Sequence, residues 1–256
     1  MFLLAIGDIV GKPGREAVKQ LLPGLKSEFG IDIVVANGEN IAHGRGLTGA
    51  TAREVLDAGI DVLTSGNHVW AQREFITCLE SGEIPVLRPL NYPPGVPGCG
   101  YLQCQGRLVV VNLIGRTFLA EVDCPFRAMD VLLENLGGPP TVIVDFHAEA
   151  TSEKAAMGRY LDGRVSAVLG THTHIATADA TILPGGTAYV TDLGMTGPIN
   201  SIIGDEIDNV LRRFLYGLPH RISVATGRGK LNSVMVEIDE SDGRARHIMR
   251  IDREMA

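Results

Sequence analysis

The chain has 256 residues, of which 45% are hydrophobic and 21% charged, and this composition is typical of a folded globular protein. Its formal net charge of −7 argues against a general affinity for nucleic-acid backbones, which depends on basic patches that release counterions. No apolar stretch reaches the roughly 18 residues of a membrane span, so a membrane protein is not expected.

The N-terminal segment and the cysteines indicate a cytoplasmic protein. Residues 1–6 are apolar, but they lack the basic lead of a signal peptide and stop at Gly7-Asp8, so we expect a first strand there. The cysteines show neither a CxxC pair nor zinc-ribbon spacing. We therefore expect reduced, structural thiols at Cys78, Cys99, Cys104 and Cys124.

Short apolar runs alternate with helical patterns along most of the chain. The expected strands lie at 2–6, 31–36, 61–65, 107–114, 141–146, 165–169 and 187–191. The expected helices lie at 14–28, 48–58, 71–81, 125–136 and 152–162. This alternation predicts βαβ units and a largely parallel sheet covered by helices.

The pattern changes after about residue 220. The segments 221–226, 231–239 and 244–251 are typical of strands joined by short turns, which predicts an antiparallel addition to the same domain. Residues 1–256 are thus expected to form a single domain. The segment 88–106 holds four prolines and is expected to be an extended surface connection, whose apolar surface could support a homo-oligomer.

Metal-capable side chains follow five of the expected strands. They are Asp8, Glu39 and Asn40, Asn67 and His68, His147, and the two histidines His172 and His174 of the Gly-Thr-His-Thr-His turn. In a parallel sheet these strand ends lie along one edge, where open α/β folds place their ligand sites. Carboxylate, amide oxygen and imidazole suit manganese, iron or zinc. The pattern therefore predicts a divalent metal cluster, in which a bridging carboxylate could hold two ions about 3.5–4 Å apart.

Each of these residues has a plainer interpretation when it is taken alone. Asp8 could cap the helix that begins near Pro13, and Glu39 and Asn40 could be turn residues. A lone histidine such as His147 is more often a hydrogen-bonded structural residue than a ligand. The joint pattern favours the metal interpretation. Three histidines stay outside it and are expected at the surface or in packing: His43, for which a place at the mouth of the pocket is the alternative, His220 and His247.

The motifs resemble, in this order, those of calcineurin-like metallophosphoesterases. The match is nearest to the YmdB-like branch of bacterial cyclic-nucleotide phosphodiesterases and extends over nearly the whole chain, including residues 112–116 and 145–154. The superfamily's usual Asp-x-His is here Asp8-Ile9-Val10, and its Gly-Asp-x-x-Asp is here Gly38-Glu39-Asn40. The YmdB-like branch shares both departures.

This resemblance implies a fold and a ligand set. The fold would be a four-layer αββα metallophosphoesterase sandwich with a largely parallel core and the C-terminal antiparallel addition. Glu39 would bridge two ions, and His68 would stay off the metals as the proton donor. One ion would be held by Asp8, Glu39, Asn40 and His174, and the other by Glu39, Asn67, His147 and His172. The family association favours iron or manganese, and zinc also fits the donors.

The expected function is a metal-dependent phosphodiesterase that hydrolyses 2′,3′- or 3′,5′-cyclic nucleotides. A hydroxide held between the metals would attack phosphorus in line, while His68 protonates the leaving alkoxide. The positive charge of the metals would admit the anionic substrate into an acidic protein. A small phosphomonoester substrate stays open.

Interpretations from other classes also stay open. A metal-dependent, phosphoester-sensing regulatory protein with weak catalysis would use the same site, so only turnover measurements separate it from an enzyme. Amidohydrolase-type enzymes also use His-x-His, but after the first strand of a barrel, whereas here the pair follows a late strand. A dinucleotide loop at Gly7, Gly11 and Gly14 lacks the GxGxxG spacing.

Overall fold

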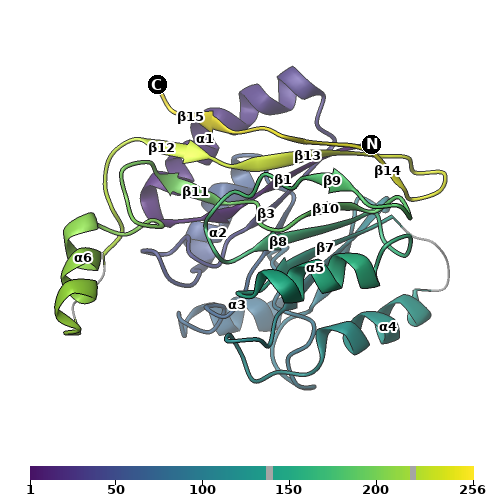
Figure 1. The fold of residues 1–256 in the computed structure, drawn as a ribbon, viewed down its shortest axis with the longest axis horizontal. Helices are drawn as coiled ribbons and strands as arrows, with labels where there is room; N and C mark the ends of the chain where they lie inside the picture. Colours follow the sequence, from purple (N-terminus) through teal and green to yellow (C-terminus); the bar gives the residue numbers. More distant parts are fainter. Residues whose placement is uncertain (137–140, 220–222) are drawn as a thin grey trace.

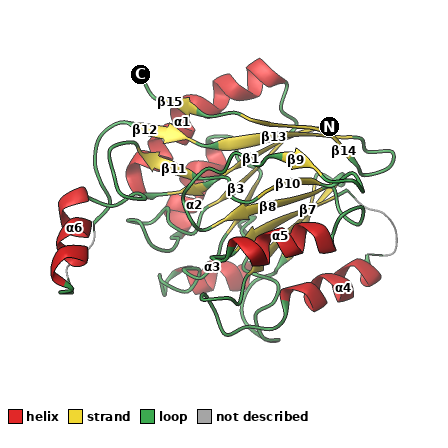
Figure 2. Cartoon of the chain, in the orientation of Figure 1, coloured by secondary structure: helices red, strands yellow, loops and turns green. Residues whose placement is uncertain are grey.

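Two β-sheets packed face to face form the centre of the molecule, and helices cover the outer face of each (Figures 1 and 2). The computed structural model describes residues 1–136, 141–219 and 223–256. One buried apolar cluster lies between the sheets, with Leu3 and Val35 from one and Val110 and Leu169 from the other. Two further clusters lie between the sheets and their helices. The chain is therefore a four-layer αββα sandwich, as predicted.

The first sheet has five strands in the order β14-β13-β1-β3-β4. β1, β3 and β4 run parallel, whereas β13 pairs antiparallel with both β1 and β14. The predicted C-terminal addition thus extends this sheet. Every residue of β3 and β4 is buried, which explains their continuous apolar sequence. The strands are β1 Phe2–Ile6, β3 Ile33–Asn37, β4 Val62–Thr64, β13 Ser233–Ile238 and β14 Ala245–Arg250.

The second sheet has six strands in the order β5-β6-β7-β8-β10-β9. The four central strands are parallel, and the two edge strands, β5 and β9, are antiparallel to their neighbours. The strands are β5 Tyr101–Cys104, β6 Leu108–Ile114, β7 Val142–His147, β8 Ala167–Thr171, β9 Thr181–Ile182 and β10 Ala188–Val190.

A small third sheet, in the order β15-β12-β11-β2, holds the backbone just after β1. Its strands are β2 Asp8–Ile9, β11 Met195–Pro198, β12 Gly229–Leu231 and β15 Arg253–Glu254. β2 runs parallel to β11, with Asp8 opposite Met195. The N–H of Asp8 also donates to the carbonyl oxygen of Gly194 at 3.0 Å. Asp8 is therefore fixed by regular backbone pairing.

Three helices cover the first sheet and two cover the second, as the apolar clusters and Figure 1 show. α1 ends at Phe29 and is followed by Gly30 in the left-handed conformation that favours glycine, and a capping box of Thr48 and Thr51 begins α2. α6 projects from the sandwich at the left of Figure 1. No helix in the described ranges is both long and apolar enough to cross a membrane. The helices are α1 Gly11–Phe29, α2 Gly49–Asp57, α3 Phe75–Ser81, α4 Pro125–Asn135, α5 Thr151–Tyr160 and α6 Ile207–Tyr216.

Three sequence predictions for the connections and the C-terminal region need correction. The segment 88–106 contains strand β5, because residues 101–104 pair with β6. The expected strand 231–239 is divided at Asn232 into β12 and β13, which belong to different sheets. The expected strand 221–226 lies partly outside the described residues, and 223–226 contain one isolated bridge, Val224 opposite Asp205. α6 and the short strands β2, β9, β11 and β15 were not predicted.

A tight approach at Gly170 gives a test of this packing. A β-carbon at Gly170 in β8 would lie 1.7 Å from the carbonyl oxygen of Thr191, so the backbone must move to admit one. We expect Gly170→Ala to lower the free energy of unfolding by about 3 kcal/mol, measured by urea denaturation. Gly24→Ala is the matched control, because a β-carbon there meets nothing within 4 Å inside α1. That control should gain about 0.5–1 kcal/mol. Equal stability of the two variants would contradict the packing described.

Candidate metal centre

The polar residues predicted for the site come together at the carboxyl ends of strands from both large sheets. Their grouping differs from the single sheet edge that was expected, because the strands that carry them are divided between two sheets. The first sheet supplies the residues after β1, β3 and β4: Asp8, Glu39, Asn40, Asn67 and His68. The second sheet supplies the residues at the ends of β7 and β8: His147, His172 and His174.

Glu39, His147 and His172 form the centre of this group. Glu39 Oε1 lies 3.2 Å from His147 Nε2, and His172 Nδ1 lies 3.0 Å from the same nitrogen. One ligand atom from each residue lies within 4.8 Å of the other two. Asn67 Oδ1 is also 3.0 Å from His147 Nε2. Oxygen and imidazole donors thus converge at a spacing that a single cation could bridge.

Asp8 lies beside this centre and is fully buried. Its Oδ2 accepts the backbone N–H of His172 at 3.1 Å. Its Oδ1 has no hydrogen-bond partner among the described residues, although His174 Nε2 is 3.8 Å away. A buried carboxylate oxygen without a partner is unfavourable unless positive charge is near. A bound cation would satisfy it.

Asn40 joins the centre to two histidines. Its Nδ2 lies 3.2 Å from Glu39 Oε1 and 3.2 Å from His174 Nε2, while its Oδ1 lies 2.8 Å from His68 Nδ1. The backbone N–H of His68 donates to Glu39 Oε2 at 3.1 Å. A half-turn of the Asn40 amide would exchange its two ends and direct the oxygen toward Glu39 and His174.

A buried hydrogen-bond network orients the ring of His147. His147 Nδ1 lies 3.0 Å from Thr171 Oγ1, and the Thr171 hydroxyl donates to Asp145 Oδ1 at 2.6 Å. Asp145 Oδ2 also accepts Asn37 Nδ2 at 3.0 Å and the hydroxyl of Thr64. Because the Thr171 proton is used toward Asp145, its oxygen accepts from Nδ1–H of His147. Nε2 then faces Glu39, and a bound cation would take the place of the proton on Nε2, as in metal-binding histidines oriented by an outer carboxylate.

The other two histidines are oriented in the same way. His172 Nε2 lies 2.9 Å from Glu149 Oε2, which leaves its Nδ1 facing His147. His174 Nδ1 lies 2.7 Å from the carbonyl oxygen of Ile203, which leaves its Nε2 facing Asp8 and Asn40. All three rings therefore meet an acceptor with their outer nitrogen and direct the inner one into the site.

Burial and neighbouring charge shift the pKa values of the site. Burial raises the pKa of Asp8 to about 6. Burial alone would also raise the pKa of Glu39, but His147 and His68 outweigh it and hold that pKa far below its usual range. Burial opposes protonation of His147, yet the Glu39 carboxylate prevails and raises its pKa to about 9. Burial, followed by the charge of His147, lowers the pKa of His172 to about 3. The group favours positive charge next to Glu39, as a cation site requires.

Sequence reasoning assigned no role to the outer partners Glu149, Thr171 and Asp145. Glu149 follows His147 by two residues, so its place just beyond a strand end was the available signal. Asp145 and Thr171 stand inside apolar, buried strands, where a polar side chain indicates a hydrogen-bond network.

The histidines left outside the pattern have different outcomes. His43 and His247 are both exposed. This agrees with the surface role expected for both. His220 lies outside the described residues.

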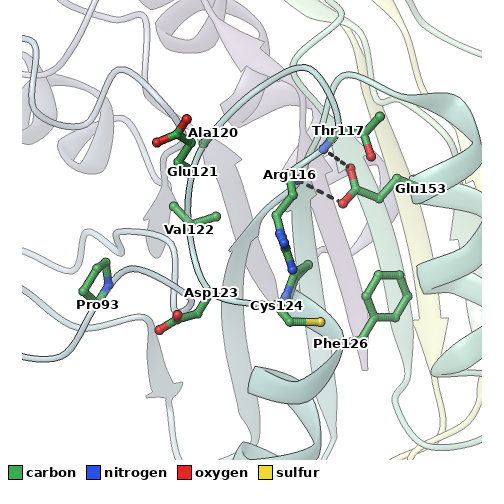
Figure 3. Close-up of a pocket in the computed structure, with 11 residues that line it drawn as sticks. Pro93, Arg116, Thr117, Ala120, Glu121, Val122, Asp123, Cys124, Phe126 and Glu153 are labelled. Atoms are coloured by element: carbon green, nitrogen blue, oxygen red, sulfur yellow. Dashed lines mark hydrogen bonds between the residues drawn. The ribbon is translucent and has the colours of Figure 1, made fainter.

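A cavity of about 680 Å³ opens at the carboxyl end of β6, next to the strand that carries His147 (Figure 3). The N–H of Gly115 at this end donates to the carbonyl oxygen of His147 at 2.9 Å. The Glu153 carboxylate accepts the backbone N–H groups of Arg116 and Thr117 at 2.9 and 3.1 Å, and Figure 3 shows the Arg116 side chain extending toward Cys124. None of the eight site residues lines this cavity.

Comparisons with known proteins agree with the family that the motifs resemble. Residues 4–251 match the family model described as YmdB-like protein. The 2′,3′-cyclic-nucleotide 2′-phosphodiesterase of Bacillus subtilis (strain 168) is 46% identical over 256 residues, which cover 98% of this chain and 96% of that protein.

Two solved structures have the same fold over nearly their whole length. A hypothetical protein from Thermus thermophilus is 45% identical, with a TM-score of 0.93 and 100% of both chains covered. A novel phosphatase from Mycoplasma pneumoniae is 32% identical, with a TM-score of 0.93 over 99% of this chain and 93% of that one. The chain therefore belongs to the YmdB-like protein family.

Proposed function

We propose that this protein is a dinuclear metal-dependent phosphodiesterase that hydrolyses cyclic nucleotides. The observation that carries the proposal is the convergence of Glu39, His147 and His172 beside the partnerless carboxylate oxygen of Asp8. The Bacillus subtilis relative is named as a 2′,3′-cyclic-nucleotide 2′-phosphodiesterase, and 46% identity over nearly both whole chains supports the same substrate class here. We therefore favour 2′,3′-cyclic over 3′,5′-cyclic nucleotides.

Two groups of residues would hold the two metal ions, with Glu39 shared between them. When bound, the ions would supply positive charge to the phosphoryl oxygens and lower the pKa of water toward neutrality. Donors of this kind suit iron, manganese or zinc, and the resemblance to the family favours iron or manganese. The first group is Asp8, Glu39, Asn40 and His174, and the second is Glu39, Asn67, His147 and His172.

His68 would remain off the ions and protonate the leaving alkoxide. Its ring is about 25% exposed and can face a substrate, while its backbone N–H is held by Glu39. When Asn40 presents its oxygen to an ion, its Nδ2 donates to His68 Nδ1, so the His68 proton resides on Nε2. Burial lowers the pKa of His68. The negative charge of a bound phosphodiester would act in the opposite direction.

The site also supports the interpretation of residues 1–256 as one catalytic domain. Asp8 and Glu39 follow strands of the first sheet, whereas His147 and His172 follow strands of the second. Neither sheet alone carries a complete set of donors.

A turnover panel tests the proposed function. The purified protein, loaded with Mn²⁺ or Fe²⁺, would be assayed with 2′,3′-cyclic AMP, 3′,5′-cyclic AMP and p-nitrophenyl phosphate. We expect the highest kcat/KM for the 2′,3′-cyclic nucleotide. Tight binding of a cyclic nucleotide without turnover would instead favour the phosphoester-sensing alternative, and preference for the monoester would contradict a diesterase.

We predict that His68→Ala retains both metal ions but loses about 10²–10⁴-fold in kcat, because general acid catalysis typically contributes that factor. Turnover of the cyclic nucleotide and elemental analysis would be measured on the same preparation. His43→Ala is the matched control, since that histidine is exposed and outside the site. A fully active His68→Ala protein with its metals present would remove His68 from the mechanism.

We predict that Glu39→Ala loses both ions, because it removes the shared carboxylate. Elemental analysis should show two metals per chain in the wild type and none in the variant. Mn²⁺ at about 100 times its Kd should stabilise the wild type by about 2.7 kcal/mol and leave the variant unchanged in thermal unfolding. The matched control is Glu83→Ala, whose carboxylate is 73% exposed. Two metals bound to Glu39→Ala would count against the bridging role.

A further inference from the structure

The turn that carries His172 and His174 has a strained backbone. His172 has φ of +103° and His174 has φ of +64°, both in the region that L-residues rarely adopt. Such conformations persist only where surrounding contacts over-determine them. Something outside the turn must therefore hold these two residues in place.

Thr173, between the two histidines, is held by a buried carboxylate from another segment. Asp192 Oδ2 accepts both the backbone N–H of Thr173 at 3.0 Å and its hydroxyl at 2.8 Å. Asp192 lies just after β10 and is fully buried. One oxygen atom thus fixes the backbone and the side chain of the residue that separates the two histidines.

The Asp192 carboxylate also supports the backbone of Asp8, and it does so through Gly194. Asp192 Oδ1 accepts the N–H of Gly194 at 2.8 Å, and the carbonyl oxygen of Gly194 accepts the N–H of Asp8 at 3.0 Å. Gly194 has φ of +89°, and an added β-carbon there would lie 2.8 Å from Ala176. Asp192 thus holds the residue between His172 and His174 directly, and it holds the backbone of Asp8 through Gly194.

Lys154 balances the charge of Asp192. Its Nζ lies 2.7 Å from Asp192 Oδ2, and its side chain is only 1% exposed. It comes from α5, which follows the His147 strand. A buried carboxylate without a counter-ion would be costly and would compete for cations with Asp8 and Glu39. The pair thus provides a firm acceptor for Thr173 with no net charge beside the site.

We propose that the Lys154–Asp192 pair is a positioning device that sets the spacing of His172, His174 and Asp8 by holding Thr173 and Gly194. Neither residue touches a proposed metal position. The inference rests on the proposed metal centre, and it adds that affinity for the ions depends on a charge pair outside the ligand set. Partners of this outer kind commonly change metal affinity by about 10- to 100-fold.

Substitutions at Thr173 test the device directly. Thr173→Val removes the hydroxyl bond and keeps the backbone bond, whereas Thr173→Ser retains both. We expect Thr173→Val to weaken Co²⁺ binding by about 10-fold and to change the visible absorption of bound Co²⁺, with Thr173→Ser close to wild type. Thr187→Val is the control, because the Thr187 hydroxyl is likewise hydrogen-bonded, while this residue is buried at the opposite end of the β8–β10 pair. It should lose stability without changing Co²⁺ affinity or spectrum.

A mutant cycle tests whether the pair acts through Thr173. Lys154→Met with Asp192→Asn removes both charges together and so leaves no unpaired buried ion. We expect this double variant to weaken Co²⁺ binding about 10- to 100-fold, and adding Thr173→Val should weaken it less than about 3-fold further. If Thr173→Val weakens Co²⁺ binding by the same factor in the double variant as in the wild type, the inference is overturned.

The outcomes separate this inference from the proposed function. A wild-type protein that binds no Co²⁺, Mn²⁺ or Fe²⁺ would overturn the metal centre itself. A wild-type protein that binds metal, together with a Thr173→Val variant of equal affinity and unchanged Co²⁺ spectrum, would overturn only the positioning role.

Discussion

The burial of two carboxylates at the proposed metal centre sets the requirement that the surrounding residues must meet. Asp8 and Glu39 are 0% and 1% exposed, and they lie where the ends of two sheets meet. Buried carboxylates persist only with positive charge or hydrogen-bond donors beside them. The inner nitrogens of His147 and His174 face these carboxylates, that of His172 faces His147, and the outer nitrogens of all three are held by acceptors at the periphery. Because the two sheets pack face to face in the αββα arrangement, both can contribute residues to one small site.

The strands and the ligand-bearing turns could be predicted because each has a local signature. β3 and β6 are buried on both faces and therefore appear as continuous apolar runs, and the polar groups follow these runs at Gly-Glu-Asn and Gly-Asn-His. The assignment of strands to two sheets could not be predicted in the same way. It depends on pairings such as Phe2 opposite Glu237, which no local pattern records. The αββα layers came instead from the resemblance to a family.

Other features lack a local signature for different physical reasons. Asp192 reaches Thr173 and Lys154 only through tertiary packing, so a single aspartate after a strand gave no indication of its contacts. α6 was missed because the alternation of buried strands and covering helices does not extend to it. Its one buried residue is Val210, and Phe214 on the same helix is 80% exposed. A prediction from the alternation of strands and helices finds only helices that pack on a sheet, and α6 does not.

The antiparallel neighbour of β1 gives the chain a fixed order of completion during synthesis. The N–H of Gly7 donates to the carbonyl oxygen of Asn232 at 3.0 Å, and β1 pairs with β13 along its length. The segment that carries Asp8 leaves the ribosome well before this partner, because Asn232 lies 224 residues after Asp8 in the chain. A nascent chain therefore cannot finish the backbone around Asp8 until Asn232 has been made. A chain that does not yet include Asn232 and β13 thus lacks the backbone pairing that supports the segment of Asp8.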